Sequence, residues 1–76
     1  MDGKYTITFM WDGDAHVWVA TSEDVAGLVL EHASFDALLA KVFIAVPELL
    51  EIEDRLHGDI SIDCVASRSE LIHAYG

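Results

Sequence analysis

The sequence predicts one α+β domain over residues 1–76, with a two-layer β-β-β-α-β order in which an antiparallel meander sheet packs on one main helix. Three observations predict it. Two alternating stretches flank an Asp-Gly turn, one apolar stripe with helical spacing follows a serine, and a further alternating stretch comes near the C-terminus. At 76 residues the chain has the length of one small domain. A chain of this size builds only a modest core, so self-association is a plausible supplement.

The first two strands are expected at residues 4–12 and 16–21, where aromatic and β-branched residues alternate with polar ones. Between them lies Asp12-Gly13-Asp14-Ala15, and an Asp-Gly pair between two strand patterns is typical of a hairpin. The sequence therefore predicts a β-hairpin at the N-terminus.

An even, symmetric hairpin loop would pair Trp11 with His16 and Phe9 with Trp18. One face of the sheet would then be the more aromatic, and the other would mix threonine with aliphatic residues. The two sets are Tyr5, Ile7, Phe9, Trp11, Trp18 and Ala20 on one face, and Thr6, Thr8, Met10, Val17, Val19 and Thr21 on the other. An odd loop or a bulge would reverse one strand relative to the other.

A short third strand is expected at residues 27–31, after the acidic turn 22–24. Ser34 is a good N-cap, and Asp36 suits the positive end of the helix dipole, so a helix is predicted to begin here. Pro47 is expected to end or kink this helix near Val46, with one more turn possible afterwards. The apolar stripe of the helix is Phe35, Leu38, Leu39, Val42, Phe43 and Val46.

The fourth strand is predicted at residues 60–66, where apolar and polar residues alternate again. Cys64 shares the parity of Ile60 and Ile62, which favours the buried role of a small hydrophobe. Residues 69–75 fit either a short terminal helix or a frayed tail.

One helix covers only one face of a sheet, so the opposite face stays apolar and unpartnered. The candidate interface residues are Met10, Trp11, Val17 and Val19. Trp18 is expected in the core, whereas Trp11, near the turn, fits the core and an interface equally well. We expect a homodimer or higher oligomer built on this side of the hairpin.

The chain is strongly acidic, with 14 Asp and Glu against 4 Lys and Arg and a net charge of −10. The four cations are scattered, so direct binding to nucleic acid or to an anionic membrane is disfavoured, whereas a basic protein partner is favoured. Acidity that only maintains solubility explains the same charge. No apolar run is long enough to span a bilayer. One cysteine and no signal-like N-terminus indicate a cytoplasmic protein.

No catalytic, metal or cofactor site is expected. The histidines have no metal-ligand spacing from one another or from Cys64, and exposed loop positions explain them better; they are His16, His32, His57 and His73. Turn chemistry explains the Asp12 and Asp14 pair. Asp59 and Asp63 bracket the fourth strand, and no acid-based catalytic motif or phosphate-binding loop accompanies either pair.

The stretch Phe9–Glu31, with Val-Trp-Val-Ala-Thr-Ser at 17–22 and Gly-Leu-Val at 27–29, resembles the HicB-like antitoxin superfamily. Together with Ser34 and Pro47-Glu48-Leu49, it is most similar to a short stand-alone branch known as a domain of unknown function. The family often has proline where this chain has Ala26, and threonine where it has Ser34. The resemblance covers roughly residues 5–52.

The resemblance implies a partial ribonuclease-H-like fold without the catalytic acids. It also implies that the domain binds and neutralises a small basic mRNA-cleaving toxin. Full-length antitoxins of this kind add a DNA-binding segment, and none is expected here. No toxin-contact residue transfers position by position.

Three functions compete at this point. An antitoxin-like protein-binding module fits the resemblance and the charge. A self-associating domain of unknown ligand or partner, without a toxin, fits the missing DNA-binding segment. A small hydrolase using Asp12, Asp63 or a histidine has only the ribonuclease-H-like topology in its favour. A neighbouring reading frame for a small basic protein would favour the first.

Overall fold

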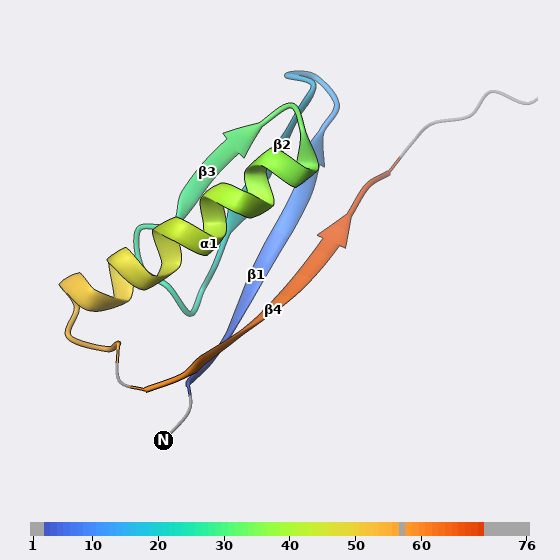
Figure 1. The fold of residues 1–76 in the computed structure, drawn as a ribbon. Helices are drawn as coiled ribbons and strands as arrows, with labels where there is room; N and C mark the ends of the chain where they lie inside the picture. The colour runs from blue at the N-terminus through green and yellow to red at the C-terminus, as the bar shows by residue number, and fades with distance from the viewer. Residues whose placement is uncertain (1–2, 57, 70–76) are drawn as a thin grey trace, which may run out of the picture.

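The α+β class is confirmed in a computed structural model that describes residues 3–56 and 58–69. Strands β1 (Gly3–Asp12), β2 (Val17–Thr21) and β3 (Val29–His32) precede helix α1 (Phe35–Ile52), and strand β4 (Ile60–Ser67) follows it. The four strands form one sheet in the order β3-β2-β1-β4, with α1 lying across one face (Figure 1). β1 to β3 form an antiparallel meander, and β4 pairs with β1 in parallel.

The hairpin forms, but its register differs from the expected one. Trp11 pairs with Trp18 and Phe9 with Ala20, so the loop is Gly13–His16 rather than residues 12–15. The side chain of Asp12 explains the difference. Its Oδ1 accepts from the N–H groups of Asp14 (3.0 Å) and Ala15 (3.1 Å), and the Asp12 carbonyl accepts from His16 N–H at 2.8 Å. His16 ends the turn with a left-handed φ of 57°.

The expected loop, residues 12–15, and the observed loop, residues 13–16, both contain four residues. The expected assignment of side chains to the two faces of the sheet is therefore confirmed despite the changed register. Tyr5, Ile7, Phe9 and Ala20 are buried under the helix. Trp18 packs edge-on against Phe35, with ring centroids 5.1 Å apart, at the margin of this core. The helix-facing side of the hairpin is therefore the core side.

The helix begins as the sequence predicts. The Ser34 side chain accepts a hydrogen bond from Ala37 N–H at 3.2 Å, and Asp36 lies in the first turn. The four helix residues that are fully buried recur every four positions and face the sheet; they are Leu38, Val42, Val46 and Leu50. This spacing places the four side chains on one side of the helix, and their burial holds that side of the helix against the sheet.

Two expectations about the helix are wrong. Pro47 does not end the helix near Val46; α1 continues to Ile52, so the further turn expected at residues 48–51 is present. Val46 and Leu50 are both fully buried, so packing on either side of the proline offsets its missing N–H. Phe43 does not belong to the buried stripe, since it lies one residue past Val42 around the helix and is 53% exposed.

The third strand begins at Val29 rather than at residue 27. Gly27 has a φ of +81°, a left-handed conformation that ends the turn and is incompatible with a strand. Val25 and Leu28 of this turn are buried against the core. The loop from β2 to β3 therefore closes one end of the core.

β4 extends one residue beyond the expected range, to Ser67, and Cys64 is exposed rather than buried. β4 is the outer strand beside β1, and the backbone of α1 lies closest to β2 and β3, away from β4 (Figure 1). Because the helix does not reach this edge, strand alternation alone does not bury Cys64. The expectation of a short helix or a frayed tail at residues 69–75 lies outside the described part of the chain, except for Ser69. His57 and His73 also lie outside it.

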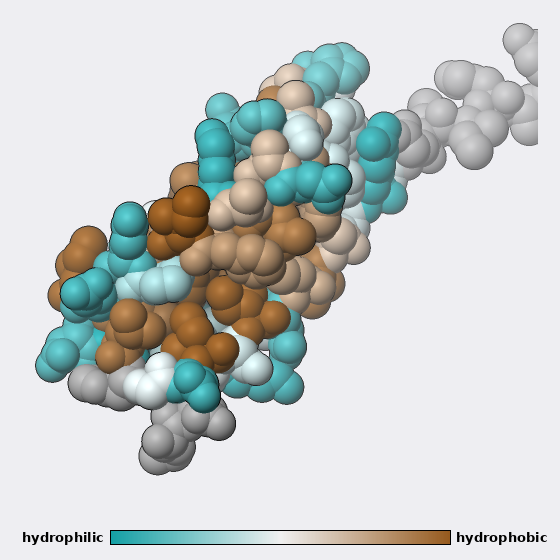
Figure 2. Space-filling view, viewed as in Figure 1, coloured by the Kyte–Doolittle hydropathy of each residue, from teal (hydrophilic) through white to brown (hydrophobic). Residues whose placement is uncertain are grey.

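Figure 2 shows the helix side of the molecule, where apolar side chains gather over α1 and the adjoining strands and hydrophilic ones lie around the rim. The exposed apolar residues of α1 include Phe43 and Ile44. In the described part of the chain, no helix combines the length and apolar character that crossing a membrane requires.

Candidate binding surface

The face of the sheet opposite α1 is uncovered within the described ranges, and we refer to it as the open face. The strand registers place Met10 beside Val19, and Thr8 between Thr21 and Val65. Val29 follows next to Thr21. Met10, Val29 and Val65 are 56%, 70% and 53% exposed. The open face therefore has an apolar centre interrupted by threonines.

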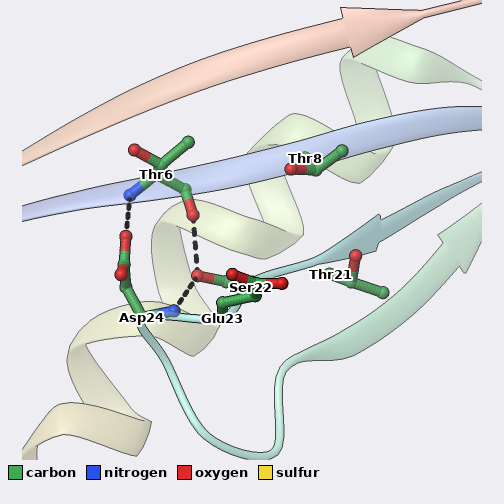
Figure 3. A pocket seen from close by; sticks show the side chains of 6 residues that line it. All are labelled: Thr6, Thr8, Thr21, Ser22, Glu23 and Asp24. Atoms are coloured by element: carbon green, nitrogen blue, oxygen red, sulfur yellow. Dashed lines mark hydrogen bonds between the residues drawn. The ribbon is translucent and has the colours of Figure 1, made fainter.

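A pocket of about 540 Å³ opens on this face where β2 ends (Figure 3). Three threonines on β1 and β2 form one wall of the pocket, and the acidic turn after β2 forms the opposite wall. The lining residues are Thr6, Thr8, Thr21, Ser22, Glu23 and Asp24. Hydroxyl and carboxylate groups dominate, so the pocket suits a partner that donates hydrogen bonds or carries positive charge.

The acidic turn is held on β1 by its own side chains. The Ser22 hydroxyl donates to the Thr6 carbonyl at 2.7 Å, and Asp24 Oδ2 accepts from Thr6 N–H at 2.8 Å. Ser22 Oγ also accepts from the N–H groups of Asp24 and Val25, at 3.0 and 3.2 Å. Since β2 ends opposite Thr8, this turn replaces the missing strand partner of Thr6.

The C-terminal end of α1 supports the same turn from behind. Arg55 donates from Nη1 to the Asp24 carbonyl at 3.0 Å and to Glu53 Oε2 at 3.3 Å. Its guanidinium also lies 5.3 Å from the centre of the Tyr5 ring. The wall of the pocket is thus connected to both layers of the domain.

A second pocket, of about 390 Å³, lies on the open face toward the hairpin turn. It shares Thr21 with the first, and its other lining residues are Met10, Trp11, Asp12, Gly13 and Val19. Three of the four candidate residues from the sequence, Met10, Trp11 and Val19, therefore meet in one pocket. The fourth, Val17, lies on the same face but pairs with Asp12 at the turn.

Trp11 serves the core side and the pocket together. Its ring packs edge-on against Trp18 at 5.6 Å, and the Arg68 guanidinium lies 4.2 Å from its centre. The indole also reaches the turn, because a Cβ built on Gly13 would lie 3.8 Å from Trp11 Nε1. A half-buried indole at the end of a sheet is a suitable anchor for a protein partner.

The charges around the open face are mostly negative. Asp12 and Glu31 lie on it, and Glu23 and Asp24 line its pocket. Lys4, a cation of β1 on the same face, forms an ion pair with Asp63 at 3.3 Å. An exposed ion pair of this kind contributes little stability, but it cancels the charge at that corner.

Within residues 3–56 and 58–69, the structure does not bring together the carboxylates and histidines considered for chemistry. Asp12 is the last residue of β1 and pairs with Val17, whereas Asp63 lies on β4 and pairs with Thr6, six residues before Asp12. No group of three His, Cys, Asp or Glu suited to a metal occurs within residues 3–56 and 58–69. His16 is exposed in the hairpin turn, as expected of a loop histidine. His32 is instead a half-buried strand residue whose Nδ1 accepts from Ser34 N–H at 2.9 Å.

The exposed thiol of Cys64 is not an activated nucleophile. Partial desolvation and the neighbouring negative charge of Asp63 both raise the pKa of the Cys64 thiol. The thiolate is the reactive form, so the environment of Cys64 lowers its reactivity at neutral pH.

Sequence reasoning missed the pocket wall formed by Ser22, Glu23 and Asp24. The acidic turn is visible in the sequence, but hydrogen bonds across sixteen and eighteen residues to Thr6 leave no local pattern. A serine followed by Asp at the second position, directly after a strand, was the available signal, since such residues cap exposed backbone groups.

Comparison with known proteins gives a family and a fold. Residues 4–76 match the family described as a domain of unknown function (DUF1902). A crystal structure of a hypothetical protein from the extremely thermophilic bacterium Thermus thermophilus is 40% identical, with a TM-score of 0.78. The match covers 91% of this chain and 99% of that one. No curated protein is significantly similar to the chain.

Proposed function

We propose that this chain, which belongs to the DUF1902 family, is an antitoxin-like protein-binding module. In this proposal the domain binds a small basic mRNA-cleaving toxin in the cytoplasm and neutralises it without catalysis of its own. The resemblance of residues 9–31 to HicB-like antitoxins supports the role. The β-β-β-α-β order of the elements is compatible with the partial ribonuclease-H-like fold which that resemblance implies.

The observation that carries the proposal is the open face, with its apolar centre and acidic surroundings. Apolar residues at the centre of an interface supply affinity, and charges around them supply steering and partner selection. Met10 and Val19 provide the apolar contact, and Glu23 and Asp24 provide negative charge one pocket away. A basic protein complements both features, whereas a nucleic acid would be repelled.

A second candidate is a self-associating domain that has no toxin. Its support is the outer edge of β4, which no other element of the described chain pairs with. The two candidates use different surfaces, so they can be separated by experiment.

The test begins with the reading frames beside the gene. The product of an adjacent frame for a small basic protein is purified, and its dissociation constant for this chain is measured by calorimetry. Cleavage of a reporter mRNA by that protein is then followed with and without this chain. The informative variant is Met10→Asp, and Phe43→Asp is its matched control, since the two side chains are 56% and 53% exposed on opposite layers.

We expect tight binding, loss of mRNA cleavage, and weaker binding for Met10→Asp only. Charge introduced at the centre of an interface typically costs binding a factor of about ten or more. Equal effects of the two variants would contradict the open face as the site. Cleavage that continues in the complex, or the absence of any small basic protein encoded nearby, would contradict the antitoxin role.

A further inference from the structure

We propose that the outer edge of β4 binds β4 of a second copy in antiparallel orientation, and that Cys64 lies opposite Cys64 of the other copy. The two sheets would join into one continuous sheet. This inference does not depend on the antitoxin-like role, because it uses the edge of the sheet rather than its open face; it specifies how the self-association of the second candidate would occur.

Alternate residues of a strand direct their backbone N–H and carbonyl groups to opposite sides. The residues of β1 that face β4 therefore show which backbone groups of β4 are left unpaired on its outer edge. Thr6 directs its N–H and carbonyl away from β4, toward Asp24 and Ser22, so the odd-numbered residues of β1 must face β4. The bond from Gly3 N–H to the Asp59 carbonyl, 3.3 Å long, agrees with this parity. In a parallel ladder, the residue opposite each inward-facing β1 residue points outward.

Four residues of β4 therefore direct their backbone N–H and carbonyl groups outward, away from β1. They are the partners of Gly3, Tyr5, Ile7 and Phe9, namely Ile60, Ile62, Cys64 and Ala66. Within residues 3–56 and 58–69 no strand lies against this edge. Free N–H and carbonyl groups in a row form a template for another strand. The edge thus offers backbone donors and acceptors at every second residue.

The opposite edge of the sheet is a poorer template. β3 contains four residues, against eight in β4. It also carries the negative charge of Glu31, whereas the only charged residue of β4, Asp63, is ion-paired with Lys4 at 3.3 Å. Short and charged edge strands resist pairing. β4 is long and locally neutral, so a second acidic copy can approach it without net repulsion there.

The occupant follows from the charge of the molecule. A basic partner gains most from the acidic open face, whereas a locally neutral edge gives it no such gain. A second copy of β4 is complementary to the edge, because it presents the same free donors and acceptors in the reverse direction. In one copy α1 lies on one side of the sheet (Figure 1). A two-fold axis through Cys64 and perpendicular to the sheet would therefore place the two α1 helices on the same side of the joined sheet.

Strand length and charge together select the register. A two-fold axis at Asp63 or at Cys64, near the middle of Ile60–Ser67, pairs more of β4 than an axis at any other residue. A two-fold axis at Asp63 would place two carboxylates directly opposite each other, which is unfavourable. An axis at Cys64 instead places Asp63 opposite Val65 and Ile62 opposite Ala66 of the other copy. It keeps outward-facing residues opposite one another, so each such pair exchanges two backbone hydrogen bonds.

The first test is the mass of the chain in solution, measured by light scattering at micromolar concentration. Wild-type protein is expected at twice the 8.4 kDa of one chain. Ala66→Pro removes an outward N–H that β1 does not use, and we expect it to weaken the dimer by about tenfold or more. Ala66→Val, the matched control, keeps the N–H and should remain dimeric.

The second test reads the register by disulfide formation under a mild oxidant. In a Cys64→Ser background, Ile62→Cys and Ala66→Cys are made as separate variants. Their mixture is expected to form a mixed disulfide much faster than either variant alone, because directly opposed residues lie about 5.5 Å apart at Cα, within disulfide range. Wild-type chains should cross-link through Cys64.

A wild-type mass of 8.4 kDa would overturn the inference, as would a dimer that persists unchanged in folded Ala66→Pro. Folding of each variant is checked by circular dichroism. If Ala66→Pro does not fold, the pairwise cross-linking still decides, because mixed disulfides no faster than the separate ones would contradict the register and the edge. Met10→Asp changes the open face and not the edge of β4, so this variant should stay dimeric. The dimer can therefore be confirmed or rejected whatever the toxin assay shows.

Discussion

The backbone N–H of Thr6 donates to Asp24 Oδ2 at 2.8 Å, across eighteen residues of sequence. The Thr6 carbonyl accepts from Ser22 beside it, so the acidic turn completes the pairing of β1 where β2 has ended. The same turn forms the wall of the larger pocket on the open face. Local stability and the shape of the candidate surface therefore depend on the same three residues.

Removing the turn's anchors should destabilise the domain. Ser22→Ala loses hydrogen bonds to Thr6, Asp24 and Val25, and we expect the free energy of unfolding to fall by about 1–3 kcal/mol. Glu23→Ala, in the same turn, is the control and should change it by less than about 0.5 kcal/mol. Chemical denaturation measures both. Equal values for the two variants would show that the Ser22 bonds add no stability.

The helix stripe gives a second prediction. Leu38→Ala removes a fully buried side chain and should cost about 2–5 kcal/mol, because it leaves a cavity under the helix. Phe43→Ala, on the exposed side of the same helix, should cost far less. A denaturation midpoint for Leu38→Ala that matches the Phe43→Ala value would contradict the placement of α1.

Pro47 lies within α1, so replacing it should stabilise the protein. Pro47→Ala restores an N–H that can bond to the Phe43 carbonyl and removes a steric clash, effects worth up to about 3 kcal/mol. The greater freedom of the unfolded chain offsets about 0.4–1 kcal/mol of that gain. We expect a higher midpoint of thermal unfolding. A lower midpoint would mean that the proline shapes the helix for packing.

The reactivity of Cys64 should depend on pH in a defined direction. Burial and Asp63 raise the pKa of its thiol, so the alkylation rate should rise at a higher pH than for an unstructured cysteine peptide. Asp63→Asn removes the smaller of the two causes and should move the profile toward lower pH. The rates are measured with iodoacetamide in the Ala66→Pro background, to keep the thiol free of a partner chain. A pH profile unchanged by Asp63→Asn would contradict the contribution of the Asp63 charge to the raised pKa of the Cys64 thiol.

Much of the fold follows from local pattern, and the errors have physical causes. Alternation and capping identify each strand and the start of the helix at Ser34. The hairpin register shifts because the Asp12 side chain bonds within its own turn, which strand periodicity does not encode. The helix passes Pro47 because tertiary packing of Val46 and Leu50 outweighs a local propensity.

The candidate surface was only partly predictable. Strand parity places Met10 and Val19 together, because an even loop preserves faces whatever its register. The pocket wall and the exposure of Cys64 depend on where β2 ends and how far the helix reaches. Both are properties of the assembled layers, and no local stretch of sequence specifies them.

If a basic protein binds the open face, NMR chemical-shift mapping will locate the contact residue by residue. Labelled chain is titrated with the small basic protein encoded beside its gene. We expect the largest shifts at Met10, Val19 and Thr21 and along the Ser22–Asp24 turn, with little change at Phe43 and Ile44 on the outer side of α1. Shifts concentrated on α1, with the open face unchanged, would contradict the account.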